Sequence, residues 1–216
     1  MDFLFEICYN ISEKVKRMNH YYTNNTDLKS EIRTIKYTYK NATVSFKTDS
    51  GVFSKEHIDF GTNVLLNSLE DLSTYKKLLD VGCGYGTIGL SIAKAYNHLL
   101  VDMVDINERA VRLANLNAKE NKIDNAVAIT SNIYENVRGT YDVVISNPPI
   151  RAGKKVVFEI VEKAKEHLNL NGFIYVVIQK KQGAPSLINK MEEVYGNIEI
   201  INKEKGYYII KSVKNN

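Results

Sequence analysis

The sequence predicts an α/β protein in which helices cover both faces of a mostly parallel sheet. After residue 75, short apolar runs of strand length alternate with longer segments whose apolar residues recur at helical spacing. Strands separated by helices in this way form sheets that are buried on both sides. The chain ends in two consecutive strand-like runs with no helix between them, which predicts an antiparallel hairpin at one edge.

The composition is that of one ordinary globular domain. The chain has 216 residues, of which 44% are hydrophobic and 25% charged. A chain of this size buries roughly 70% of the surface that its unfolded form exposes. Disordered, collagen-like and disulfide-rich chains are excluded. The two cysteines, Cys8 and Cys83, stand in no spacing typical of a metal site, so we expect a metal-free protein.

Two features bear on location and partners. The longest apolar runs, for example 143–145 and 175–178, are too short to cross a membrane, and Glu6 interrupts the apolar start of the chain, unlike a signal peptide. We therefore expect a cytoplasmic protein with no membrane partner. The formal net charge of +4 is compatible with a nucleic-acid partner, and equally with the lysine bias of a particular genome.

Three segments are expected along the chain. Residues 1–17 form an N-terminal extension with apolar residues at helical spacing. It is either an amphipathic helix or, if translation starts at Met18, not native. Residues 18–60 hold a β-hairpin that turns at Lys40 and Asn41, followed by a loop-like entrance segment. Residues 61–216 form the main domain.

Each element of the main domain is predicted from its own pattern. The first helix covers residues 61–72, because leucine and valine side chains there fall on one helical face. The other helices are expected over residues 87–96, 108–121, 156–168 and 185–195. The strands are expected over residues 77–81, 99–105, 126–130, 141–146, 173–178, 198–203 and 208–212. In such a sheet, ligands bind beyond the carboxyl ends of the parallel strands.

A glycine-rich turn follows the first of these strands. Gly82, Gly84 and Gly86 form a G-x-G-x-G pattern, and the first two let the backbone turn sharply and approach a ligand closely. The spacing differs from the G-x-G-x-x-G of a dinucleotide-binding loop. Asp80, just before the turn, would repel a phosphate. It suits a cationic ligand such as S-adenosylmethionine, which carries a sulfonium and an ammonium group and no phosphate.

Residues after the next two strands complete a candidate nucleoside site. Asp105 lies about 20 residues beyond the glycines, where a carboxylate can accept both ribose hydroxyls of an adenosine. Asn132 could bond the adenine amino group, with Ile106 and Ile133 on the two faces of the ring. The alternative is structural: the two aspartates would cap the helices that follow them, and Asn132 would be a polar turn residue.

Two adjacent prolines stop the fourth strand at Asn147. The rigid Pro-Pro turn would hold Asn147 beside the crevice at the end of the sheet. Amino groups on nucleobases and amides are poor nucleophiles, because their lone pair is delocalised. The Asn147 side-chain oxygen and the Pro148 carbonyl could accept both N–H groups and turn the lone pair toward a methyl sulfonium, so that positioning supplies most of the rate. A simple strand-ending turn is the alternative.

These motifs resemble class I S-adenosylmethionine-dependent methyltransferases that act on exocyclic amino groups. More narrowly, residues 48–54 (TDSGVFS) and 147–154 (NPPIRAGK) resemble the ribosomal RNA small subunit methyltransferase C family, and the likeness extends from about His20 to the C-terminus. It implies a Rossmann-like seven-stranded fold with an N-terminal β-hairpin extension and S-adenosylmethionine as cofactor. It further implies ribosomal RNA or the small ribosomal subunit as partner, and methylation of N2 of a guanine in 16S ribosomal RNA.

The family implies a role for each matching position. Asn147 would hold the target amino group, assisted by Pro148 and Pro149. The substrate would be contacted by Ile150, Arg151, Lys154 and Lys155. The three cations among them would reach RNA phosphates, or alternatively only solvent. The cofactor would be contacted by Phe53, Asp80, Gly82, Gly84, Gly86, Asp105, Ile106, Asn132 and Ile133.

Departures from the family pattern leave alternatives open for the acceptor. Asn132 stands where many members carry an aspartate, and the chain holds one of the two tandem halves of the longer members. Ile150 replaces the aromatic residue usual in adenine-N6 enzymes, which favours guanine. The alternatives are another amino or amide acceptor (adenine-N6 in nucleic acid, a protein glutamine or a small molecule) and a non-catalytic RNA-binding assembly factor. His57 and Cys83 are not expected to be catalytic, since methyl transfer to an amine needs no covalent intermediate.

Overall fold

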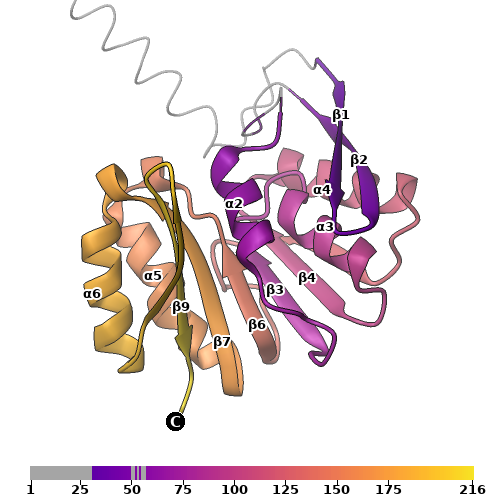
Figure 1. The fold of residues 1–216 in the computed structure, drawn as a ribbon. Helices are drawn as coiled ribbons and strands as arrows, with labels where there is room; N and C mark the ends of the chain where they lie inside the picture. The colour runs from indigo at the N-terminus through magenta and orange to yellow at the C-terminus, as the bar shows by residue number, and fades with distance from the viewer. Residues whose placement is uncertain (1–30, 50–51, 53, 55–56) are drawn as a thin grey trace, which may run out of the picture.

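The computed structural model describes residues 31–49, 52, 54 and 57–216 (Figure 1). The helix expected within residues 1–17 and the entrance residue Phe53 lie outside the described residues.

A seven-stranded sheet forms the centre of the molecule, with the strand order β5-β4-β3-β6-β7-β9-β8. The first five strands in this order are parallel, β9 pairs antiparallel with β7, and β8 pairs antiparallel with β9. The predicted α/β class, the seven strands and the closing hairpin are therefore confirmed. The strands are β3 (Lys77–Val81), β4 (Leu100–Asp105), β5 (Ala126–Thr130), β6 (Tyr141–Ser146), β7 (Leu168–Gln179), β8 (Glu199–Glu204) and β9 (Tyr207–Val213).

Helices cover both faces of this sheet (Figure 1). One apolar core holds residues of α2 (Phe60–Ser68), α3 (Thr87–Ala95) and α4 (Glu108–Glu120), and the other holds residues of α5 (Lys154–Ala164) and α6 (Ala184–Tyr195). Adjacent residues of β3 show why the cores are separate: Leu78 belongs to the first and Leu79 to the second, because successive side chains of a strand point to opposite faces.

The predicted N-terminal hairpin is present as β1 (Arg33–Tyr39) and β2 (Ala42–Thr48) and lies over α3 and α4 (Figure 1). Two asparagines four residues apart, one in α4 and one at its C-cap, hold the hairpin in place. Asn117 Oδ1 accepts from the Lys47 amide at 2.7 Å and Asn121 Oδ1 from the Ser45 amide at 2.8 Å, while their Nδ2 groups donate back to the same two residues. The side-chain amides thus pair with β2 as a neighbouring strand would.

Three predicted boundaries were wrong by four or five residues: the ends of the first and fourth helices, and the start of the strand expected over 173–178. The first helix ends at Ser68 rather than at residue 72, because Leu69 is already extended. Leu72 is nevertheless fully buried. It lies in a loop, and its own backbone amide donates to the Tyr96 hydroxyl at 3.2 Å. The helix expected over 156–168 ends at Ala164, and Leu168 starts β7 by pairing with Tyr141. At both helix ends, an apolar residue at helical spacing is buried by a different element.

The strand order determines where the ligand-binding crevice of the fold lies. β3 lies at the centre, with β4 on one side and β6 on the other. The chain leaves β3 toward α3 and leaves β6 toward α5, which cover opposite faces of the sheet. Ligands bind at such a switch point in open α/β sheets. The residues that follow β3, β4 and β6 are the glycine turn, the segment after Asp105, and Asn147.

Candidate active site

The glycine turn is folded against the end of β4. The amides of Gly82 and Cys83 both donate to the Val104 carbonyl, at 2.8 and 3.0 Å. Gly82, Gly84 and Gly86 all have positive φ, at 78°, 56° and 93°, which side chains disfavour. A Cβ on Gly86 would lie 2.7 Å from Leu90, so this glycine serves packing. A Cβ on Gly82 would meet only Pro149, at 3.8 Å. A Cβ would therefore fit there in ordinary contact with Pro149, so the positive φ, rather than crowding, is what favours glycine at position 82.

Asp105 ties the glycine turn to the end of β4. Its Oδ2 accepts from the Gly84 amide at 2.8 Å, and its Oδ1 accepts from the Asn107 amide at 2.8 Å. The cap of α4 is Asn107, which accepts from the amides of Arg109 and Ala110, so the capping alternative does not hold for Asp105. Burial raises the pKa of Asp105, against the opposing effect of these backbone N–H groups.

Asp80 lies beneath the turn and is fully buried. Its Oδ2 accepts from the Gly89 amide at 2.9 Å, in the first turn of α3, so it satisfies a helix terminus as the capping alternative predicts. Its Oδ1 has no hydrogen-bond partner among the described residues. Burial, with a smaller contribution from the Asp105 charge, raises the pKa of Asp80 to about 7. An unpartnered buried carboxyl oxygen under a ligand-facing turn fits a cationic group bound above it.

The segment after β5 is held in a strained turn. The Ser131 amide donates to the Asp105 carbonyl at 2.9 Å, which joins the ends of β5 and β4. Ile133 has a φ of 52°, a conformation that β-branched residues rarely adopt. Asn132 is exposed and its amide nitrogen donates to Glu135 at 2.8 Å. Ile106 is 44% exposed, so it offers an apolar surface at the same edge.

Asn147 is held by two residues that the sequence did not single out. Its Nδ2 lies 3.0 Å from Asp59 Oδ2 and 2.9 Å from Thr62 Oγ1. Because an ionised carboxylate can only accept, the atom facing Asp59 is the amide nitrogen. Both N–H groups of the amide are then engaged, and Oδ1 is the side-chain atom that can accept from a ligand. Ser146, just before, anchors the strand end by donating to the Val81 carbonyl at 2.7 Å.

One sequence pattern could have identified Asp59 as a helix cap, although it does not predict the contact with Asn147. Asp59 caps α2, because its Oδ2 also accepts from the Thr62 amide at 3.0 Å. An aspartate followed three residues later by a polar residue, just before an apolar helical pattern, marks a helix start. Placing the helix start at residue 61 missed the cap.

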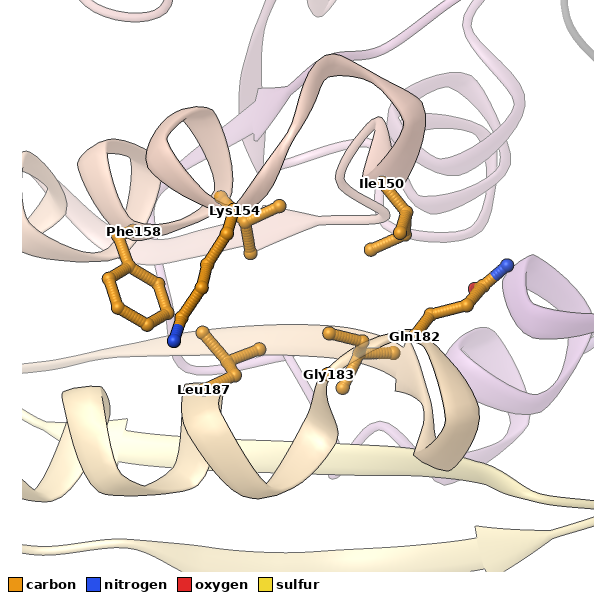
Figure 2. Close-up of a pocket in the computed structure, with 8 residues that line it drawn as sticks. Ile150, Lys154, Phe158, Gln182, Gly183 and Leu187 are labelled. Atoms are coloured by element: carbon orange, nitrogen blue, oxygen red, sulfur yellow. The ribbon is translucent and has the colours of Figure 1, made fainter.

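The substrate candidates after Asn147 lie on a short turn and the start of α5. Ile150 faces an apolar cavity between α5 and α6, lined also by Val157, Phe158, Ile178 and Leu187 (Figure 2). Lys154 reaches along this cavity, with its Nζ 4.9 Å from the centre of the Phe158 ring. Arg151 and Lys155 are exposed to solvent.

Cys83 and His57 show no sign of a catalytic pair. Cys83 is buried, its thiol donates to the Gly84 carbonyl at 3.5 Å, and burial raises its pKa well above the usual range, so it is not a reactive thiolate. His57 is exposed, and its carbonyl accepts from Ser54.

Two features are absent from the part of the chain that the structure describes. No helix there is long and apolar enough to cross a membrane. No group of three or more His, Cys, Asp or Glu side chains gathers there in an arrangement that could hold a metal ion.

Sequence comparisons relate this chain to methyltransferases. A family model for the methyltransferase small domain matches residues 43–211. The chain is 47% identical over 197 residues to the protein YbxB of Bacillus subtilis (strain 168), covering 90% of this chain and 98% of that one. It is 32% identical over 192 residues to ribosomal RNA small subunit methyltransferase C of Haemophilus influenzae (strain 86-028NP), covering 86% of this chain and 56% of that one. It thus spans about half the length of this relative.

Solved structures show the same fold. A T. thermophilus 16S rRNA guanine-N2 methyltransferase in complex with AdoMet and guanosine matches with a TM-score of 0.75 and 23% identity, covering 87% of this chain and 52% of that one. A methyltransferase from Pyrococcus furiosus matches with a TM-score of 0.61 and 22% identity, covering 70% of this chain and 80% of that one.

Proposed function

The chain belongs to the methyltransferase small domain family and is an S-adenosylmethionine-dependent methyltransferase; we propose that its acceptor is an exocyclic amino group, N2 of a guanine in 16S ribosomal RNA. The observation that carries this proposal is the orientation of Asn147. Its two N–H groups face Asp59 and Thr62, so a carbonyl oxygen is left to accept at the crevice. An acceptor there suits a substrate that donates N–H groups, as an amino group does.

The chemistry asked of this chain is mainly positioning. S-adenosylmethionine would supply, when bound, the transferred methyl group, whose bond to the sulfonium sulfur breaks as the bond to the target nitrogen forms and leaves a neutral thioether. Asn147 Oδ1 and the Pro148 carbonyl would accept the two N–H groups of the target, which turns the nitrogen lone pair away from them and toward the glycine turn. The nitrogen gains positive charge as the new C–N bond forms, and two oxygens aimed at its N–H groups stabilise that charge. The surplus proton then leaves to solvent.

The cofactor is assigned to the ends of β3, β4 and β5. Gly82 and Gly84 would let the backbone approach it, Asp105 would accept from ribose hydroxyls, and Asp80 would act on its positive charge from beneath the turn. Gly86 would support the turn through packing. Ile106, Asn132 and Ile133 would contact the adenine, with Phe53 at the entrance.

Cations at the same edge of the sheet support an RNA partner. Arg151 and Lys155 precede or begin α5, Lys180 and Lys181 lie between β7 and α6, and all four are exposed. None of these four takes part in an ion pair within the described ranges. Farther along the two helices, by contrast, Lys163 pairs with Glu159, and Lys190 with Glu162 and Glu193.

These unpaired cations suit RNA phosphates. A ribosomal substrate would place the protein in the cytoplasm.

A panel of acceptors tests the proposal. Labelled S-adenosylmethionine is incubated with the protein and with 30S subunits, naked 16S RNA, tRNA, DNA or a protein extract, each from a source that lacks the modification. Products are digested to nucleosides or amino acids and identified by mass. N2-methylguanosine from a ribosomal sample is the expected product. Label only in adenine or glutamine would identify a different acceptor, and binding of the cofactor without transfer to any sample would favour an RNA-binding assembly factor.

A further inference from the structure

We propose that Asp59 and Thr62 are positioning residues that lock the Asn147 side chain with its carbonyl oxygen toward the crevice and increase the negative charge on that oxygen. The inference rests on the proposed function, because the role of Oδ1 is to hold the target amino group. It adds a functional contribution from α2, which lies outside the glycine turn and the Asn147-Pro-Pro segment.

The Asn147 side-chain amide has two possible orientations. The oxygen and nitrogen of asparagine have nearly the same size, so an unrestrained side chain can rotate and exchange them. With Nδ2 turned to the crevice, the side chain would present its N–H groups to the N–H groups of the target. These two sets of donors repel one another. Asp59 Oδ2 at 3.0 Å and Thr62 Oγ1 at 2.9 Å occupy both N–H groups. Rotation would place Asn147 Oδ1 against the Asp59 carboxylate, so the flipped state is disfavoured.

The Asp59 carboxylate polarises the Asn147 side-chain amide. Asp59 accepts from an N–H group of Asn147, and a negative charge at that end of an amide shifts electron density toward the carbonyl oxygen. Hydrogen bonds in a chain strengthen one another where water is scarce; Thr62 is buried, and Asp59 and Asn147 are half-buried. A more negative Oδ1 binds better to a nitrogen that is becoming cationic than to the neutral amine. This difference favours the transition state over bound substrate.

The surroundings of Asp59 keep the pair in place. Asp59 Oδ2 also accepts from the Thr62 amide, so one oxygen serves both the helix cap and Asn147. The closing hairpin packs directly beside it: a Cβ on Gly61 would lie 2.6 Å from the Tyr207 ring. Phe60 lies 5.5 Å from the same ring, centre to centre. The start of α2 is thus packed against β9.

Variants can separate positioning from helix capping. Serine is a good cap but is too short to reach Asn147, so Asp59→Ser keeps the helix start and removes the contact. Thr62→Val keeps the shape and removes the hydroxyl, whereas Thr62→Ser keeps the hydroxyl. We expect kcat for methyl transfer to 30S subunits to fall about 10- to 100-fold in Asp59→Ser and Thr62→Val, as for loss of a hydrogen bond involving a charged or buried group. The KM for subunits should change little, and Thr62→Ser should restore most of the rate. Asp124→Asn, an exposed carboxylate in the turn before β5, is the control.

A measurement without RNA keeps this inference separate from the proposed function. The Asn147 side-chain amide, assigned by its absence in Asn147→Ser, is followed by ¹⁵N–¹H NMR in the free protein. Its two protons should exchange slowly with solvent in the wild type and rapidly in the Asp59→Ser/Thr62→Val double variant. Equal exchange rates in the two proteins would overturn the inference. Faster exchange in the double variant together with an unchanged kcat for methyl transfer would overturn it as well. A wild-type protein that methylates no RNA would contradict the proposed function, while the exchange data would still decide whether Asn147 is locked.

Discussion

Oδ2 of Asp105 lies 2.8 Å from the amide nitrogen of Gly84, so a carboxylate at the end of β4 fixes the glycine turn at the end of β3. The same side chain reaches the Asn107 amide through Oδ1. One residue therefore shapes the turn, and each of its oxygens retains a lone pair that can accept from a ribose hydroxyl. The glycine turn and the proposed nucleoside site would therefore depend on the same carboxylate.

Asp105→Ala should weaken cofactor binding more than it weakens the fold. Loss of the acceptor for two backbone N–H groups destabilises the turn, whereas removal of a buried charge stabilises it, and the two effects oppose one another. The ribose contacts have no such offset. We expect the Kd for S-adenosylmethionine, measured by isothermal titration calorimetry, to rise at least about tenfold. Asp124→Ala should leave it unchanged, and an unchanged Kd in Asp105→Ala would remove Asp105 from the cofactor site.

Asp80 should make stability depend on pH around neutrality. Its pKa is about 7 in the folded protein and near 3.8 when unfolded, because burial penalises the charged form. Between these values the folded state keeps a proton that the unfolded state has lost. The free energy of unfolding therefore falls as pH rises from about 4 to about 7, and this contribution is constant above that range.

The test compares wild type with Asp80→Asn by urea unfolding at several pH values. Since asparagine does not titrate, the variant should lack this fall, which is on the order of 4 kcal/mol. The difference in unfolding free energy between the two proteins should therefore shift in favour of the variant as pH rises. Parallel curves would mean that Asp80 is not titrating in this range.

The exposed cations Arg151, Lys155, Lys180 and Lys181 should contribute to RNA binding through phosphate contacts. We expect the double variants Arg151→Gln/Lys155→Gln and Lys180→Gln/Lys181→Gln to bind 16S RNA more weakly at low salt. Each should also reduce the slope of log K against log salt by up to about 1.4 to 1.8, the contribution of two phosphates. Lys76→Gln/Lys119→Gln neutralises two exposed lysines at the other end of the sheet and should leave the slope unchanged. Similar slopes in all variants would place RNA elsewhere.

The fold could be predicted because its patterns are local. Apolar strand-length runs, helical spacing and the final pair of strands are each readable over a few residues. The ends of helices and strands were harder to predict. Leu72 and Leu168 are both buried, and their apolar character fits a helix as well as the loop and strand that hold them. Sequence patterns predict that a residue is buried more reliably than they predict whether a helix, a strand or a loop holds it.

The candidate site could be predicted as far as its residues lie next to strand ends. The glycine turn, Asp105 and Asn147 meet because parallel strands bring their carboxyl ends together. Asp59 and Thr62 could not be placed there, since 85 to 88 positions separate them from Asn147 and only the packing of α2 joins them. Asn117 was missed for the same reason: it contacts both β2 and the Tyr85 carbonyl from the middle of α4.

Asn147→Ala removes the carbonyl that is proposed to hold the target amino group. Single-turnover methyl transfer from S-adenosylmethionine to 30S subunits is measured beside the cofactor Kd, with Cys83→Ala as a control in the neighbouring turn. The account predicts a loss of at least about 100-fold in Asn147→Ala with an unchanged Kd, and near wild-type transfer in Cys83→Ala. Near wild-type transfer by Asn147→Ala, or an equal loss in both variants, would contradict it.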